Sequence, residues 1–184
     1  GFLNKKLIMY MGVSILIGSF IGAYGSRLMT EGSIHVVYAL MATIAAVMMF
    51  VPKKGIDDIP FAQVTFNRWL ASLSAFVVGV GAGIVGAAGA FILVPIMLVI
   101  LKIPTRMTIA TSLAITFLSS IGSTIGKVAT GQVLFVPAFI MIVASLIAAP
   151  IGANFGKKVN TKLLQGILAL LILGTSINIW IDIL

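Results

Sequence analysis

The chain has 184 residues, of which 60% are hydrophobic and only 9% are charged, with a formal net charge of +8. This composition is typical of an integral membrane protein and argues against an ordinary soluble domain. The basic residues lie singly or in pairs between apolar runs, which argues against nucleic acid as a partner. Because the sequence contains no cysteine, disulfides, thiolate metal sites and cysteine nucleophiles are excluded.

Six apolar stretches follow one another along the chain, each long enough to cross a bilayer as a helix. They cover residues 7–26, 32–51, 69–101, 107–126, about 134–156, and 163–181. The opening GFLNKKL has neither an initiator methionine nor a cleavage-site pattern. We therefore expect the first stretch to be a true span, and we expect further chain to precede it. Segment 52–68 is the one sizeable polar linker.

The third stretch, residues 69–101, carries no charge over 33 residues and is interrupted by GVGAGIVGAAGA and by Pro95. A single span needs about 20 apolar residues, so this stretch is too long for one upright helix and barely long enough for two. We predict a re-entrant or twice-crossing helical hairpin that is broken by glycine. Irregular backbone is tolerated in a membrane where protein buries it or where it lines a wet cavity. The break is therefore a candidate substrate site.

The distribution of Lys and Arg favours this hairpin. If residues 69–101 cross once, six basic residues lie on each side of the membrane; if the stretch enters and leaves on the same side, the count is ten against two. Cytoplasmic loops are enriched in Lys and Arg, so the second arrangement is preferred. It places the N-terminal residues and the 52–68 linker in the cytoplasm and the C-terminus outside. Arg27 and Lys127 are then the two basic residues on the outer side.

A shift of 130 residues aligns nine identical residues within thirty positions, including the IGA at 21–23 with the IGA at 151–153. With the hairpin topology the two copies run in opposite directions, which is the inverted-repeat arrangement of many secondary transporters. We predict three parts. Residues 1–55 are the last two spans of a first repeat whose N-terminal part is missing, residues 56–68 are a cytoplasmic linker, and residues 69–184 are a second repeat, made of the hairpin 69–101 and three spans.

Two short patterns carry a family resemblance. The first is GAAGA at 86–90, followed by FILV and Pro95; the second is ATSL at 110–113, followed by Lys127 and the turn GQV at 131–133. With the IGA of span 134–156, these features resemble the TauE/SafE sulfite exporters, a family of anion permeases. The resemblance covers essentially the whole chain, as the last six of the family's usual eight or so apolar segments. The chain departs from the family pattern at Ala88 and Ala90, where glycine is more usual, and at Lys127, where histidine is frequent.

The resemblance implies export of sulfite or a related small organosulfur or organic anion. A helix that restarts near Gly89 would present free N–H groups and a partial positive charge to such an anion, and hydroxyls on the span 107–126 would add donors. The residues expected to meet the substrate are Gly86, Ala88, Gly89, Ala90, Thr111, Ser112, Ser119 and Lys127. Those expected to have structural roles are Gly79, Gly83, Pro95, Gly22 and Gly152.

Each feature also has a plainer interpretation. Small residues such as Gly79 and Gly83 let membrane helices pack closely without any contact with substrate. Serine and threonine hydroxyls in apolar helices commonly bond to the preceding turn. Lys127 also fits an interfacial lysine that reaches toward the lipid headgroups. No carboxylate lies inside a predicted span, so the sequence leaves open both coupling to an ion and facilitated diffusion.

We therefore expect an all-α polytopic membrane protein, an inverted-repeat, transporter-like bundle in the plasma (inner) membrane. Its expected partners are a small anion and the lipid bilayer, with no nucleic acid, cofactor or metal. The alternative functions are an anion channel and a non-transporting scaffold subunit, and a homo-oligomer is left open. Catalytic residues are not expected, because His35, the single histidine, stands alone near the border of a span.

Overall fold

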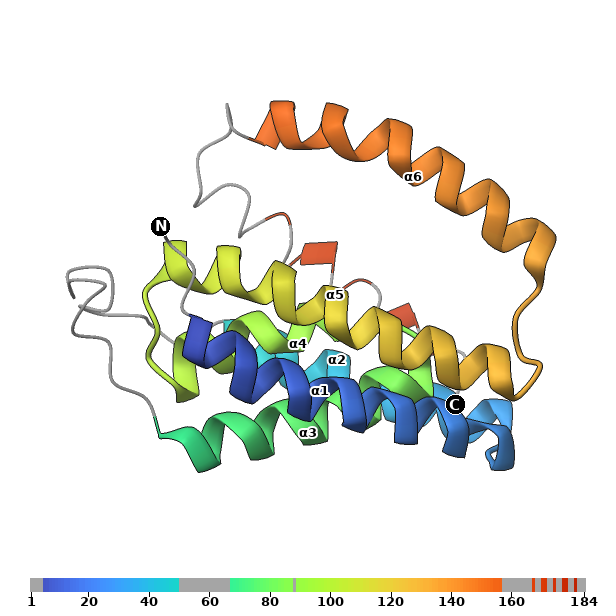
Figure 1. Ribbon diagram of the computed structural model, residues 1–184, viewed down its shortest axis with the longest axis horizontal. Helices are drawn as coiled ribbons and strands as arrows, with labels where there is room; N and C mark the ends of the chain where they lie inside the picture. The colour runs from blue at the N-terminus through green and yellow to red at the C-terminus, as the bar shows by residue number, and fades with distance from the viewer. Residues whose placement is uncertain are drawn as a thin grey trace.

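The computed structural model describes residues 5–49, 67–87 and 89–156, together with single helical positions between residues 167 and 181. In chain order the elements are α1 (Lys5–Gly25), the 3₁₀ turn η1 (Ser26–Leu28), α2 (Glu31–Met49), α3 (Arg68–Val85), α4 (Ala90–Pro95), the π-helical turn η3 (Ile96–Ile100), α5 (Thr105–Ala129) and α6 (Phe135–Gly156). Every element in the described ranges is helical, which confirms the predicted all-α class (Figure 1).

Five helices in the described ranges are long and apolar enough to cross a membrane. They correspond to the predicted spans 7–26, 32–51, 107–126 and 134–156 and to the first limb of the predicted hairpin. The start of this limb is set by Asn67, whose side chain accepts hydrogen bonds from the backbone N–H groups of Trp69 and Leu70. The predicted linker 52–68, apart from its last two residues, and the predicted span 163–181, apart from single helical positions, lie outside the described residues.

Helices α1, α3 and α5 run in the same direction, while α6 runs the opposite way (Figure 1). Since α3 and α5 are parallel, the chain between them must return to the end of the bundle from which α3 starts. The hairpin therefore begins and ends at the same end of the bundle, as the charge count predicts. The opposite directions of α1 and α6 agree with an inverted repeat over residues 11–25 and 141–155, although the division into two repeats stays a prediction.

Glycine brings α1 and α3 together backbone to backbone. A Cβ atom added to Gly79 would lie 2.6 Å from the carbonyl oxygen of Ile15, and one added to Gly22 would overlap the carbonyl group of Val80. Gly83 is similarly tight against the α1 backbone. Small residues let membrane helices approach in this way where lipid provides no hydrophobic driving force between them. This interface consists of main chain against main chain.

The second face of α1 packs against α5 by the same means. A Cβ on Gly122 would lie 2.5 Å from the carbonyl oxygen of Leu16, and one on Gly126 would lie 2.7 Å from the Cβ atom of Ala23. Between these contacts, the Ser19 hydroxyl donates a hydrogen bond to the carbonyl oxygen of Ser119, over an oxygen-to-oxygen distance of 3.0 Å. Helix α1 is thus held between α3 and α5, and it positions the ends of both.

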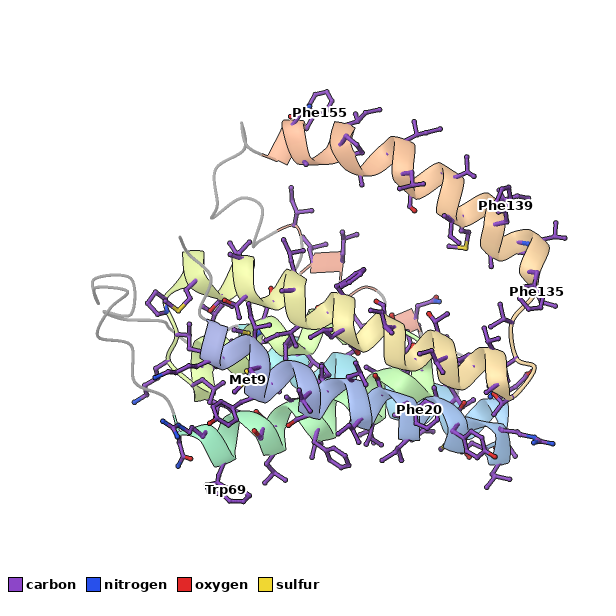
Figure 2. All side chains as sticks on the ribbon, viewed as in Figure 1. Met9, Phe20, Trp69, Phe135, Phe139 and Phe155 are labelled. Carbon is purple, nitrogen blue, oxygen red and sulfur yellow. The ribbon has the colours of Figure 1, made fainter. Side chains whose placement is uncertain are left out.

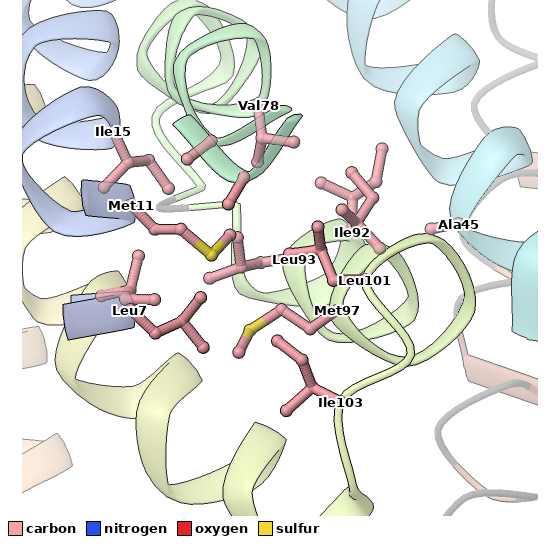
Figure 3. Packing of buried hydrophobic residues seen from close by; sticks show 14 of the residues in the cluster. Leu7, Met11, Ile15, Ala45, Val78, Ile92, Leu93, Met97, Leu101 and Ile103 are labelled. Carbon is pink, nitrogen blue, oxygen red and sulfur yellow. The ribbon is translucent and has the colours of Figure 1, made fainter. Parts of the chain in front are cut away.

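The second limb of the hairpin supplies the middle of the core. Leu93 and Met97 are fully buried, and Figure 3 shows them beside Met11, Leu7 and Ile103, among side chains from the surrounding helices. The limb comprises α4 and η3, whose eleven residues rise about 16 Å, roughly half of a bilayer's apolar thickness. The predicted glycine-broken hairpin is confirmed, with one long limb and one short limb.

Pro95 marks the change from α-helix to π-helix within this short limb. Proline has no N–H group to donate and disturbs the regular ladder of an α-helix. Beyond it, the N–H of Leu101 bonds to the carbonyl oxygen of Ile96, five residues earlier, at 3.1 Å. Such widened turns occur mostly as single turns inside helices, often at functional sites. Pro95 therefore has a local structural role, because the α-helix ends at this residue and the π-helical turn begins after it.

Large apolar side chains cover the outside of the bundle. Those of α6 are almost all exposed, among them Phe135, Phe139 and Phe155, and Figure 2 shows Phe155 pointing away from the other helices. Trp69 is also exposed, at the start of α3, where an aromatic ring suits the interface between membrane and water. An apolar exterior on this scale marks a surface that faces lipid or another apolar partner.

Candidate functional site

The C-terminal ends of α1, α3 and α5 meet at one end of the bundle around Lys127. The Lys127 ammonium donates hydrogen bonds to the hydroxyl oxygen of Ser26 at 2.9 Å, to the side-chain oxygen of Gln132 at 3.0 Å and to the carbonyl oxygen of Ile84 at 3.2 Å. An ammonium group has three N–H donors, so these bonds use all of them. We call these four residues the Lys127 cluster.

All three acceptors in this cluster are formally neutral. The cluster lies at the carbonyl ends of α1 and α3, where the helix dipole places partial negative charge and favours a cation. These dipoles and hydrogen bonds stabilise the ammonium, but no carboxylate is among its hydrogen-bond partners. The cluster therefore keeps a net positive charge at this end of the bundle.

The Gln132 side chain links the cluster to the end of α1. Its side-chain nitrogen donates to the hydroxyl oxygen of Thr130 at 2.6 Å and, more weakly, to the carbonyl oxygen of Ala23 at 3.4 Å. The Ser26 hydroxyl is 2.8 Å from the same Ala23 carbonyl oxygen and 3.1 Å from the Gln132 side-chain oxygen. The amide is thus bonded through both its oxygen and its nitrogen, although Gln132 itself is exposed.

The local sequence explains how Gln132 reaches Lys127. Gly131 has a φ angle of +70°, and the N–H of Gln132 bonds to the carbonyl oxygen of Lys127 while that of Gly131 bonds to Val128. This pair of bonds is the Schellman ending of a helix, in which glycine supplies the left-handed residue. The turn brings the chain back over the last turn of α5. The GQV pattern thus encodes this local geometry.

The hairpin break lies beside this cluster. Gly86 ends α3 with a φ angle of +84° and is exposed; a Cβ there would lie 3.9 Å from the Cε atom of Lys127. The N–H groups of Gly86 and Ala87 both bond to the carbonyl oxygen of Ala82, which leaves the later carbonyl of Ile84 available to Lys127. Two of the predicted substrate residues, Gly86 and Lys127, are therefore neighbours.

Gly89 has a different environment from the one the sequence suggests. Its φ angle is +67°, and a Cβ there would lie 2.9 Å from both the Ala82 Cβ atom and the Val78 Cγ1 atom. Gly89 is buried, so the space beside it is filled by α3. It begins α4 as predicted, but its lack of a side chain serves packing against α3. Ala88 and the side chain of Ala90 lie outside the described residues.

The predicted hydroxyl residues lie deeper along α5. Thr111, Ser112 and Ser119 are all buried. Ser112 bonds to the carbonyl oxygen of Ile109 at 3.1 Å, as in the plainer interpretation of such residues, whereas the hydroxyl oxygens of Thr111 and Ser119 have no hydrogen-bond partner among the described residues. Sixteen residues of helix separate Thr111 from Lys127, a rise of about 24 Å. The predicted substrate residues therefore form two groups at different depths.

The glycines predicted to be structural also divide into two groups. Gly22, Gly79 and Gly83 lie in the tight interface between α1 and α3, whereas nothing lies within 4 Å of a Cβ built on Gly152. Gly152 thus has no packing contact of this kind within the described part of the chain. In the same part, no group of three or more His, Cys, Asp or Glu side chains is placed to hold a metal ion.

Sequence reasoning missed three members of the Lys127 cluster. In the sequence, Ser26 is one small residue at the end of the first apolar stretch, and Gln132 is one letter of a turn motif. The Ile84 contribution is a backbone carbonyl, which no side-chain pattern reveals. A polar residue directly after the glycine that ends α5 is the one signal that could have pointed to Gln132.

The fold and this site define a polytopic helical membrane protein with a glycine-broken hairpin and a partly exposed lysine cluster at one end of the bundle. The model of the family described as "Sulfite exporter TauE/SafE" matches residues 1–179, and the chain belongs to that family.

One curated relative is the "Probable membrane transporter protein YunE" of Bacillus subtilis (strain 168), which is 28% identical over 172 residues. The matched region covers 85% of this chain and 63% of that relative, so the chain spans less than two thirds of the relative's length. No solved structure matches the chain.

Proposed function

We propose that this protein is a transporter of a small oxyanion, with sulfite or a related organosulfur or organic anion as its substrate. The observation that carries the proposal is the Lys127 cluster: a positive charge held only by neutral oxygens beside the exposed break of the hairpin. An uncompensated cation of this kind raises the local concentration of anions. The family's description as sulfite exporters and the name of the YunE relative support the same class of function.

The basic residues support one orientation of the site across the membrane. Lys6, Arg68 and Lys102 lie where α1 and α3 begin and just before α5 begins, whereas Arg27 and Lys127 lie at the opposite end. Because Lys and Arg are enriched in cytoplasmic loops, we place the end with Lys6 inside and the Lys127 cluster outside. In an exporter in the plasma membrane, the cluster is then the point at which the anion leaves the protein.

Buried hydroxyls give this proposal a second point of contact. Thr111 and Ser119 lie inside the bundle with unpartnered hydroxyl oxygens, and a buried hydroxyl without a partner is costly. An oxyanion passing through the bundle would accept hydrogen bonds from them. We propose Thr111 and Ser119 as inner contacts on the way to Lys127.

An enzyme fits these residues poorly. Hydrolysis within a membrane needs a nucleophile beside a base, and the described histidine, His35, is exposed near the start of α2. The described carboxylate, Glu31, is exposed at the start of the same helix, whereas Thr111 and Ser119 of α5 are buried. Binding and passage of an anion need neither group.

The test is sulfite flux into liposomes that hold the complete parent chain, with sulfate, acetate and a sulfonate as competitors. The proposal expects saturable flux that sulfite inhibits most strongly. Flux that rises linearly with concentration and does not saturate would identify an anion channel. Flux no greater than that of empty liposomes, at either sign of membrane potential, would reject transport and favour a scaffold subunit.

A further inference from the structure

The three hydrogen bonds of Lys127 leave its ammonium no free donor for a substrate. Its partners differ in how easily an anion can replace them. Ile84 contributes a carbonyl of the α3 backbone, and Ser26 lies in the short η1 turn with 2% of its surface exposed. Gln132 lies on an exposed loop after α5 and reaches Lys127 with a side chain. Of the three, the Gln132 amide is the partner that an incoming anion can displace.

We propose that Gln132 is a gating and specificity residue, whose amide oxygen occupies at Lys127 the position that the substrate oxyanion takes when it binds. This proposal rests on the proposed transport of an anion. It deepens that function by naming the group that closes the site, which neither the family pattern nor the buried hydroxyls indicate.

Displacement of Gln132 would select for charge. A hydrogen bond from an ammonium to an anionic oxygen is shorter and stronger than one to a neutral oxygen. A sulfite-like oxyanion therefore competes with the Gln132 amide, whereas a neutral polar solute offers no better acceptor than the amide. The closed arrangement keeps all three hydrogen bonds of the Lys127 ammonium in place when no anion is present. It also weakens binding, because the apparent association constant is the intrinsic one multiplied by the fraction of time that the site is open.

Displacement would also loosen one end of the bundle. The Gln132 side chain bridges Lys127 on α5 and the Ala23 carbonyl at the end of α1. Once the amide moves, α1 and α5 remain joined at this end through the bond between Lys127 and Ser26. Deeper in the bundle, the bond from Ser19 to the Ser119 carbonyl still joins them. The gate therefore opens at its outer edge without separating the helices.

The test combines flux with the chemical reactivity of Lys127 in the complete parent chain. In detergent, a water-soluble acylating reagent is applied with and without sulfite, and acylation of Lys127 is measured by mass spectrometry relative to that of Lys6. Lys6 is exposed at the other end of the bundle and corrects for reagent that sulfite consumes. Gln132→Ala should raise the relative reactivity of Lys127 about fivefold, the effect of losing one ordinary hydrogen bond. Sulfite should reverse this increase.

In liposomes, Gln132→Ala should lower the KM for sulfite with little change in maximal rate. Gln132→Glu should raise that KM about tenfold or more, because a carboxylate fixed beside the ammonium competes with the substrate. Ser33→Glu is the matched control: Ser33 is exposed near the start of α2, at the same end of the bundle. It adds the same charge outside the cluster and should leave KM unchanged. If both Gln132 variants lose maximal rate at constant KM, Gln132 has only a structural role and the proposal is overturned.

The two proposals fail in distinguishable ways. If the wild-type chain shows no sulfite flux but sulfite still protects Lys127 from acylation, transport is rejected while the gated anion site stands. If sulfite flux is saturable but KM is the same in wild type and both Gln132 variants, transport stands and the gate is rejected. Lys127 reactivity that responds neither to Gln132→Ala nor to sulfite would also reject the gate.

Discussion

The ammonium nitrogen of Lys127, on α5, lies 2.9 Å from the hydroxyl oxygen of Ser26, which stands 101 residues earlier at the end of α1. This contact joins the C-terminal ends of two parallel helices through a charged group that no carboxylate neutralises among its hydrogen-bond partners. The hydrogen bond holds the Lys127 side chain against the protein, although Lys127 lies near the border of a span. The bond supports a role for Lys127 beyond contact with lipid headgroups.

Replacing Lys127 with methionine should lower sulfite flux about tenfold or more, because a hydrogen bond to a charged group contributes roughly 1.5–3 kcal/mol. Lys6→Met is the control: it removes one positive charge at the opposite end of the bundle and should leave flux unchanged. Initial rates in liposomes at several sulfite concentrations provide the measurement. Equal flux in both variants would remove Lys127 from the substrate path.

The repeat-related glycines Gly22 and Gly152 should respond differently to the same change. Gly22→Ala places a methyl group against the Val80 carbonyl and should destabilise the fold by about 1–3 kcal/mol, as overpacking does. Gly152→Ala meets open space, so only helix propensity acts, and the change should be within about 1 kcal/mol and toward greater stability. Unfolding in mixed detergent micelles measures both. Similar losses would show that Gly152 is packed in the complete protein.

Gly89 and Gly131 separate backbone strain from packing. Both have φ near +70°, so alanine at either should cost about 1–2 kcal/mol in backbone conformation. Gly89→Ala should cost about 1–3 kcal/mol more, because its new methyl group would meet Val78 and Ala82. Thermal unfolding of the two variants in one detergent makes the comparison. Equal shifts in melting temperature would mean that α3 moves to admit the new methyl group at Gly89 with no loss of stability.

Much of this fold can be predicted from where charge is absent and glycine is concentrated. The uncharged stretch 69–101 is too long for one span, its glycines favour a break, and the positions of Lys and Arg favour a topology in which its two ends lie on one side. The structure begins α4 directly after Gly89 and makes α3 and α5 parallel. Both features follow from the length of the uncharged stretch and from the positions of its glycines, and a single sequence contains this information.

The helix partners could not be predicted in the same way. In a membrane helix that is apolar on all sides, no periodic pattern distinguishes the face that meets protein from the face that meets lipid. Gly22 and Gly152 occupy the same IGA motif, yet one is tightly packed and the other open. The bonds from Lys127 to Ser26 and to the Ile84 carbonyl depend on this packing, so of this cluster and the neighbouring break the sequence predicts only Gly86 and Lys127.

Thr111→Val tests the inner contact of the proposed path. The change keeps the shape of the side chain but removes a buried hydroxyl without a hydrogen-bond partner among the described residues. Stability should stay the same or rise by about 1 kcal/mol, because an unsatisfied polar group is lost. If Thr111 donates to the substrate, the KM for sulfite should rise about threefold or more.

Thr116→Val is the matched control for this change, since its hydroxyl oxygen is also buried and unpartnered in the described part of the chain. Thr116 was not assigned to the substrate path. Unfolding measurements should show the same or slightly higher stability in both variants, whereas KM should change only in Thr111→Val. An unchanged KM in both would confine the proposed path to the Lys127 end of the bundle.

The orientation of the bundle can be tested with single cysteines introduced into a cysteine-free version of the parent chain. Leu28, at the Lys127 end, is 90% exposed, and Lys102, near the start of α5, is also exposed. The excess of basic residues at the Lys102 end predicts that this end is cytoplasmic. A membrane-impermeant maleimide should therefore label Leu28→Cys in intact cells, and should label Lys102→Cys only after permeabilisation. The reverse pattern would place the Lys127 cluster in the cytoplasm, where it would receive the anion before export instead of releasing it.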